Sequence, residues 1–205
     1  AHSNAMMVAT QSLEDMLQAW DFKVPIHRVT RGARLDIFYP GEKTLFKDLQ
    51  RPVALYVGRL AIEKNVEDFL RMDWPGAKVL VGDGPRLAEL KRKYPQAVFT
   101  GTKLGEELAA HYRSADLFVF PSRTDTFGMV LVEALASGLP VAAYNVTGPK
   151  DIITESFLGT LHENDLAHAA QQALVCGTPE QRAAHVKNYY TWENAARQFE
   201  VAMKE

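Results

Sequence analysis

The feature that most constrains the fold is an alternation of short apolar runs with helix-like segments, which begins near residue 52 and continues past residue 140. The apolar runs are continuous, as expected of strands that are buried on both faces of a parallel sheet. The expected strands cover 52–57, 78–81, 97–100, 117–121 and 140–144, and the expected helices cover 65–72, 85–94, 105–114, 126–137 and 149–154. Beyond residue 164 the pattern is helical to the end, with a break near 177–179. The pattern predicts an α/β, Rossmann-like, three-layer domain with a parallel sheet.

Composition excludes several other classes. With 47% hydrophobic and 23% charged residues in a chain of 205, the sequence can bury one sizeable core and is not disordered as a whole. The net charge of −2 gives no basic footprint for nucleic acid, and no run approaches the ~20 apolar residues of a transmembrane segment. One cysteine allows no intrachain disulfide. We therefore expect a cytoplasmic protein without a nucleic-acid partner.

The loop after the first expected strand carries two cations, Arg59 and Lys64, on either side of a turn that opens a helix. A helix start offers free N–H groups and partial positive charge, and arginine binds phosphate oxygens through forked hydrogen bonds. The loop therefore fits a diphosphate site. It equally fits a solvated arginine and lysine beside a helix start, so this loop alone leaves both interpretations open.

The loop after the second expected strand contains Gly82 and Gly84. A glycine there lets the backbone approach a flat ligand closely, or it simply permits a tight turn. The three spaced glycines of a dinucleotide-binding fingerprint are not present. This loop is therefore a weak indication when taken alone.

The third loop, in the segment PSRTDTFGMVLVEALASGLPV at 121–141, holds two carboxylates, Asp125 and Glu133. Asp125 precedes the expected helix, which Thr126 can cap, and Glu133 lies about two turns into it. Every neighbour of Glu133 is apolar, and burying a lone carboxylate is costly. Glu133 is therefore expected to have a polar partner, such as the hydroxyl groups of a ligand, or to lie on one solvated face of the helix.

The segments GRLAIEKN, VGDGP and PSRTDTFGMVLVEALASGLPVAA resemble, in order and spacing, the motifs of the C-terminal domain of family-4 retaining glycosyltransferases (glycosyl transferase group 1). The resemblance covers roughly residues 29–200 and implies the C-terminal half of a GT-B fold. It also implies transfer of a hexose from a GDP- or UDP-linked sugar to an acceptor hydroxyl, with retention at the anomeric carbon. The TDTFG sequence is similar to that of mannosyltransferase-like members.

The resemblance implies a role for each motif residue. Arg59 and Lys64 would bind the donor diphosphate, Asp125 the transferred sugar and Glu133 the ribose, with Arg59, Lys64 and Asp125 as the catalytic set. Asp125 stands where glutamate is commoner in the family, but TDTFG is itself a recurrent variant there, so the resemblance still implies the sugar contact. No metal ion and no cofactor are expected, since the sequence has no Asp-x-Asp pair and no His/Cys cluster. The donor-binding residues so implied are Gly58, Arg59, Lys64, Gly82, Thr102, Lys103, Asp125, Thr126, Phe127, Gly128, Met129, Val130 and Glu133.

The resemblance also divides the chain. Residues 1–5 resemble an expression-tag remnant, 6–28 a remnant of the N-terminal domain and linker, and 29–205 the nucleotide-sugar-binding domain. The acceptor-binding N-terminal domain is then the missing partner, through an artificial boundary or a mis-assigned start, and the chain is expected to bind donor but to transfer sugar weakly or not at all. A homodimer through the exposed domain face is left open.

The sequence is also compatible with two other functions. The chain could be a non-catalytic nucleotide-sugar-binding module, or a subunit that docks a separate N-terminal domain. A nucleotide-sugar epimerase on the same architecture is the third reading, and the TDTFG-to-Glu133 segment argues against it because epimerases lack this helix start.

Overall fold

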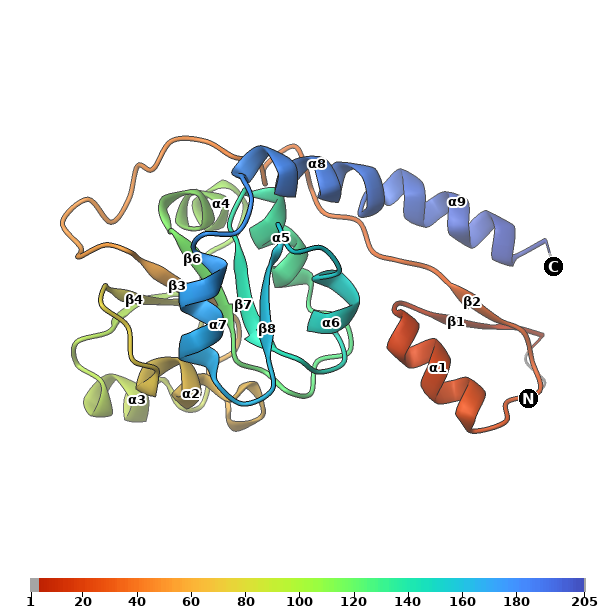
Figure 1. The fold of residues 1–205 in the computed structure, drawn as a ribbon, viewed down its shortest axis with the longest axis horizontal. Helices are drawn as coiled ribbons and strands as arrows, with labels where there is room; N and C mark the ends of the chain where they lie inside the picture. The colour runs from red at the N-terminus through yellow and green to blue at the C-terminus, as the bar shows by residue number, and fades with distance from the viewer. Residues whose placement is uncertain (1–3, 205) are drawn as a thin grey trace.

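The computed structural model describes residues 4–204, and its centre is a six-stranded sheet in which all strands run parallel (Figure 1). The strand order is β5-β4-β3-β6-β7-β8, which is the order of doubly wound nucleotide-binding folds. The prediction of a Rossmann-like parallel sheet is confirmed, although strand β8 was not foreseen. The strands are β3 (Ala54–Val57), β4 (Lys78–Val81), β5 (Val98–Gly101), β6 (Leu117–Phe120), β7 (Val141–Tyr144) and β8 (Gly159–His162).

Helices cover both faces of this sheet. The described helices of the domain are η1 (Ile62–Lys64), α2 (Val66–Arg71), α3 (Leu87–Lys93), α4 (Gly105–Ser114), α5 (Met129–Ala136), α6 (Pro149–Ile152), α7 (Leu166–Ala173) and α8 (Pro179–Tyr189). Side chains of α4, α5, α6 and α8 join one hydrophobic cluster, and those of α2, α3 and α7 join the other. Alternate residues of β3 enter opposite clusters, Leu55 the first and Tyr56 the second. The strand is therefore apolar throughout because both of its faces are buried.

The amino-terminal residues form a separate small unit. Strands β1 (Met6–Val8) and β2 (Ile26–Arg28) pair in parallel, with helix α1 (Gln11–Ala19) between them. In Figure 1 this unit lies apart from the main sheet, on the side toward which helix α9 (Trp192–Ala202) extends. No residue of α1 is buried. Residues 6–28 therefore form two short paired strands and a helix of their own.

Hydrogen bonds connect this unit, and the segment that follows it, to other elements of the described chain. The Ser12 backbone N–H and hydroxyl both donate to Asp151 Oδ1, at 2.9 and 2.8 Å. The Thr30 backbone N–H and hydroxyl donate to Gln198 Oε1 of α9, at 2.8 and 3.0 Å. No helix within residues 4–204 combines the length and apolar character that crossing a bilayer requires.

Helix α5 begins later than the sequence suggested. Its first residue is Met129 and its N-cap is Gly128, so the expectation that Thr126 caps it is wrong. Gly128 adopts φ +85°, a left-handed conformation that glycine tolerates and other residues rarely adopt. Residues that were expected to be helical therefore extend the preceding loop. Glu133 lies about one turn into the helix, not two.

Helices α2 and α3 are joined through one carboxylate. Glu67 contacts Lys93, accepts from Arg86 Nη2 at 2.9 Å and from the Tyr94 hydroxyl at 3.0 Å, and pairs with Arg71 Nη2 at 3.1 Å. The hydrogen bonds from Lys93 and Arg86 lower the pKa of Glu67 to about 2. This network adds to the apolar contacts of Phe69 and Leu90 in joining two helices that are too short to be stable alone.

Replacing Glu67 with glutamine is expected to destabilise the domain by about 1–3 kcal/mol at pH 7, because hydrogen bonds to a charged acceptor are lost. The folded-state pKa lies below the unfolded value, so this stabilisation is present above about pH 4.5 and is lost as the pH falls toward 2. Urea unfolding of both proteins at pH 7 and pH 3 measures the effect. Glu107→Gln, which removes an exposed partner of Lys103, should leave the free energy of unfolding nearly unchanged, because solvent screens such a pair. Equal losses in the two variants would contradict the prediction.

Candidate donor-binding site

The candidate site lies at the point in the sheet where the order of strand addition changes side. Strands β3 and β6 are neighbours, and from them the sheet extends to β5 on one side and β8 on the other. Ligands of such folds bind beyond the carboxyl ends of the strands at this point. The two loops that follow β3 and β6 touch there: the Thr124 hydroxyl donates to Glu63 O at 3.3 Å, and Asn65 Nδ2 to Pro121 O at 3.3 Å.

An ion pair joins the two loops. Lys64 Nζ lies 2.6 Å from Asp125 Oδ1, and the two side chains are 29% and 21% exposed. The second oxygen, Asp125 Oδ2, is buried and has no hydrogen-bond partner among the described residues. Buried polar atoms are normally satisfied, so an unpartnered carboxylate oxygen is costly in the free protein. A hydroxyl donor brought by a ligand would remove that cost. The structure thus brings together two residues that the sequence placed in one site.

Arg59 is not part of this pair. Its guanidinium Nη1 lies 3.6 Å from Glu63 Oε1, and its side chain is 65% exposed. A surface pair of this kind contributes about 0–1 kcal/mol, so it leaves the side chain free to reorient. The backbone beside it is held more firmly, because Arg59 O accepts from the buried Tyr56 hydroxyl at 2.8 Å. A buried hydroxyl thus holds the backbone of Arg59, whereas its guanidinium is exposed and has only a weak surface partner.

Glu133 has a protein partner. The Tyr112 hydroxyl of α4 donates to Glu133 Oε2 at 3.0 Å, and Tyr112 itself is fully buried. Burial raises the pKa of Glu133 above its ordinary value, and the hydrogen bond from Tyr112 opposes that rise. The expectation of a polar partner is confirmed, although sequence reasoning missed Tyr112 as the donor. One oxygen remains for a ligand.

Glycines hold the loops at this edge close together. A Cβ atom on Gly82 would lie 2.0 Å from Gly58 O, and one on Gly148 would lie 2.5 Å from Asp125 O. The loop after β4 therefore presses on the loop after β3, and the loop after β7 presses on the backbone of Asp125. For Gly82 the sequence suggested a close approach to a ligand or a tight turn, whereas the contact that the structure shows is with the backbone of Gly58. Gly148 was not singled out from the sequence, where one glycine in a loop carries no distinctive signal.

The start of α5 offers backbone donors. Helices leave the N–H groups of their first turn without intrahelical partners, and no side chain caps this turn. The remaining expected residues lie around this edge. Thr102 and Lys103 follow the edge strand β5, where Lys103 pairs with Glu107. Phe127, Met129 and Val130 belong to the loop and first turn of α5.

A second cluster beside the site was not predicted. Asp68 Oδ2 accepts from Asn65 Nδ2 at 2.6 Å and from the Tyr144 hydroxyl at 2.7 Å. Burial and the hydrogen bond to Asp68 raise the pKa of Tyr144 to about 12, and Arg123 lies 3.5 Å from the centre of its ring.

Among residues 4–204 no group of three or more His, Cys, Asp or Glu side chains is arranged to hold a metal ion.

Known proteins of similar sequence are glycosyltransferases. The family described as Glycosyl transferases group 1 matches residues 51–176, which is more than half of the chain. A GDP-mannose-dependent alpha-mannosyltransferase of Mycobacterium tuberculosis is 41% identical over 143 residues, covering 66% of this chain and 38% of that protein. A protein of the same name from Mycolicibacterium smegmatis is 37% identical over 186 residues, covering 85% and 48%. The chain therefore spans less than half the length of these relatives.

Solved structures share the fold. Sucrose-phosphate synthase from Thermosynechococcus elongatus superimposes with a TM-score of 0.85 at 27% identity, over 99% of this chain and 58% of that one. Anabaena HepE, solved in complex with UDP and glucose, superimposes with a TM-score of 0.78 at 16% identity, over 98% and 63%. The latter likeness concerns the fold alone. On the match to its residues 51–176, this chain belongs to the glycosyl transferases group 1 family.

Proposed function

We propose that this chain is the donor-binding half of a retaining hexosyltransferase, which transfers a sugar from a nucleoside diphosphate to an acceptor hydroxyl. The observation that carries the proposal is the Lys64–Asp125 pair at the carboxyl ends of β3 and β6, with Asp125 Oδ2 buried and unpartnered. A cation for the diphosphate and a free acceptor for a sugar hydroxyl lie side by side there.

The chemistry in this proposal is stabilisation of the leaving diphosphate. Lys64, a reoriented Arg59 and the N–H groups at the start of α5 would take up its developing charge. Asp125 would hold the transferred sugar through its free oxygen. The acceptor hydroxyl would enter from the face that the diphosphate leaves, which retains the anomeric configuration. None of these groups requires a metal ion.

The proposed donor is GDP-mannose. Support comes from the relatives named GDP-mannose-dependent alpha-mannosyltransferases, which match this chain at 41% and 37% identity. The specificity of the whole protein for base and sugar would come from the loop at Gly101–Lys103 and from Asp125 with Met129. UDP-linked sugars are the alternative donors for the binding test.

Transfer is proposed to need a second, acceptor-binding domain. The amino-terminal unit presents apolar side chains to solvent: Met16, Trp20 and Phe22 are 40%, 64% and 43% exposed. Exposed apolar side chains gathered on one small unit favour a partner surface. A separate N-terminal chain or a second copy of this chain would cover the same residues. The isolated 205 residues are therefore expected to bind nucleotide while transferring sugar weakly or not at all.

We propose that Glu133 accepts a hydrogen bond from the ribose of the donor, and a nucleotide that lacks one ribose hydroxyl tests this contact. A 2′-deoxynucleoside diphosphate is expected to bind the wild-type chain about 10-fold more weakly than the ribonucleotide, because one hydrogen bond to a charged acceptor is lost. In Glu133→Gln the difference should shrink to about 2-fold, since a neutral acceptor binds the hydroxyl less strongly. Isothermal titration of both nucleotides with both proteins measures this.

The pH dependence provides an independent check. Because burial raises the pKa of Glu133, its protonation starts at a higher pH than for an exposed glutamate. Affinity of the wild type should fall as the pH is lowered through that pKa, and Glu133→Gln should lack this part of the pH profile. An undiminished preference for the ribonucleotide in Glu133→Gln would rule out the proposed contact.

A further inference from the structure

Lys64 lies between two hydrogen bonds that join its own loop to the loop after β6. On one side of it in the sequence, Glu63 O accepts from the Thr124 hydroxyl at 3.3 Å. On the other side, Asn65 Nδ2 donates to Pro121 O at 3.3 Å. The lysine ammonium itself contacts a carboxylate of the second loop at 2.6 Å. The backbone on both sides of this lysine is therefore held against the loop that its side chain meets.

Asn65 adopts a backbone conformation that few residue types tolerate. Its φ of +52° and ψ of +32° lie in the left-handed region, where it ends η1 and begins α2. Glycine adopts this conformation most easily, and asparagine is among the few other residues that adopt it. The turn therefore admits glycine or asparagine, but only asparagine adds a side-chain amide that can bond to the second loop.

The orientation of the Asn65 amide is fixed from the sheet. Its Nδ2 also donates to Asp68 Oδ2 at 2.6 Å, and that oxygen accepts from the Tyr144 hydroxyl at 2.7 Å. Tyr144 belongs to β7 and is only 3% exposed. A side-chain amide has two N–H groups, so one can bond to Asp68 while the other bonds to Pro121 O. A buried strand residue thus determines, through one carboxylate, where the amide points.

Of the two cations in this loop, Lys64 is the one that the fold orders. Its side chain is 29% exposed and paired at 2.6 Å, whereas that of Arg59 is 65% exposed with a partner at 3.6 Å. A lysine side chain has many rotamers, and ordering it when a ligand arrives costs free energy. A lysine that is already held at the site avoids this cost at the moment of binding.

We infer that Asn65 is a positioning residue for the diphosphate site. Its amide joins the loop after β3 to the loop after β6 and so holds the Lys64 ammonium where the phosphates of a nucleoside diphosphate bind. Asn65 acts through Lys64, without a contact to the ligand. The inference rests on the proposed function, because the position of Lys64 matters to affinity only if a phosphate binds there.

Asn65→Gly tests the inference, because glycine keeps the left-handed backbone and removes only the amide. Isothermal titration should show GDP binding weakened about 5-fold, or about 1 kcal/mol. In the Lys64→Ala background the same change should weaken GDP binding by less than about 2-fold, since the residue through which Asn65 acts is absent. Equal losses in the two backgrounds would assign the amide a general role in the fold and overturn the inference.

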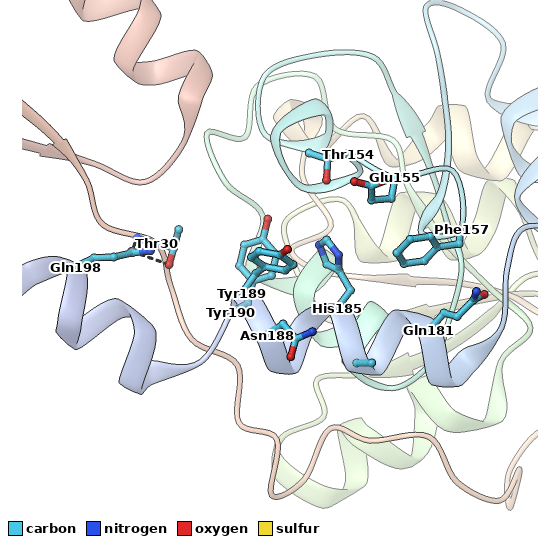
Figure 2. A pocket seen from close by; sticks show the side chains of 11 residues that line it. Thr30, Thr154, Glu155, Phe157, Gln181, His185, Asn188, Tyr189, Tyr190 and Gln198 are labelled. Carbon is cyan, nitrogen blue, oxygen red and sulfur yellow. Dashed lines mark hydrogen bonds between the residues drawn. The ribbon is translucent and has the colours of Figure 1, made fainter.

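Two control variants match the parts of this substitution. Asp21 also has a left-handed backbone, φ +58°, but lies in the amino-terminal unit, so Asp21→Gly changes only a turn. Asn188→Ala removes another side-chain amide, from α8, where Asn188 lines a separate pocket of about 710 Å³ (Figure 2). The lining of that pocket includes no residue of the loops after β3 and β6. Both controls should leave GDP affinity unchanged.

Tyr144→Phe examines the same network if Asn65→Gly does not fold. It removes the hydroxyl that donates to Asp68 and should weaken GDP binding about 2-fold, again only where Lys64 is present. Unchanged GDP affinity in both Asn65→Gly and Tyr144→Phe would overturn the inference while the proposed function stood.

Nitrogen NMR of the Lys64 ammonium group, recorded without nucleotide, gives a readout that does not depend on binding. The signal of the paired ammonium should be present in the wild type and lost in Asn65→Gly, and its persistence there would overturn the inference. Failure of the wild type to bind GDP or UDP would instead count against the proposed function, and the ammonium signal would still decide whether Asn65 positions Lys64.

Discussion

Replacing Lys64 with alanine is expected to weaken the binding of a nucleoside diphosphate by about 100-fold, or about 2.7 kcal/mol. The substitution removes a cation from the phosphate site, and a hydrogen bond to a charged group contributes about 1.5–3 kcal/mol. It also leaves Asp125 without its partner at 2.6 Å, so that an unpaired carboxylate faces the incoming phosphates. Isothermal titration with GDP and UDP measures the change. A loss smaller than about 3-fold would contradict the assignment.

The chain offers a matched control for this substitution. Lys43 also pairs with an aspartate, Asp116, but at the opposite end of the sheet, and Asp116 keeps Arg51 and the Val53 N–H as further partners. Lys43→Ala should therefore leave nucleotide affinity unchanged. A second control separates the two causes of the loss. The double variant Lys64→Ala/Asp125→Asn lacks the unpaired carboxylate of Asp125. It should therefore bind GDP about 10-fold more tightly than the single variant Lys64→Ala does.

Much of this site could be foreseen, because its strongest signals are local in sequence. Continuous apolar runs predicted β3, β4, β6 and β7, since strands buried on both faces admit few polar residues. The resemblance to family-4 glycosyltransferases then assigned Lys64 and Asp125 to one site, although 61 positions separate them. Strand β8 (Gly159–His162) was missed because three of its four residues are only partly buried and the strand is not uniformly apolar.

The remaining differences come from tertiary contacts that a pattern does not encode. Helix α5 begins at Met129 because Gly128 adopts a left-handed conformation, whereas Thr126 was the stronger capping residue by type. The donor to Glu133 is Tyr112, on a helix whose tyrosine is indistinguishable in sequence from a packing residue. The Tyr144 hydroxyl donates to the Asp68 carboxylate because α2 lies close to the end of β7. In each case the partner is distant in sequence, so only the fold reveals it.

Gly82→Ala is expected to have the largest effect on stability, at about 3 kcal/mol or more. The new Cβ would lie 2.0 Å from Gly58 O, and the residue adopts φ +138°, which side-chain-bearing residues rarely tolerate. Gly58 and Gly82 directly follow the buried strands β3 and β4, so neither backbone can move without disturbing a strand. For a chain of this length the midpoint of thermal unfolding should fall by about 6–12 °C. Because the displaced Gly58 loop carries Arg59 and Lys64, nucleotide affinity should fall as well.

The contrast with Gly105→Ala separates close approach from backbone strain. Gly105 also has a positive φ, +53°, but no atom lies within 4 Å of the position that its Cβ would take. Its substitution therefore carries only the cost of the left-handed conformation, about 1–2 kcal/mol, and does not touch the Gly58 loop. Calorimetry and GDP titration of both variants measure the two effects together. If Gly82→Ala lost no more stability than Gly105→Ala and bound GDP normally, contact between the loops after β3 and β4 would not be what positions Lys64. A larger loss with weakened binding in Gly82→Ala alone would show that the glycine supports the site by letting two backbones touch, without any contact to the ligand.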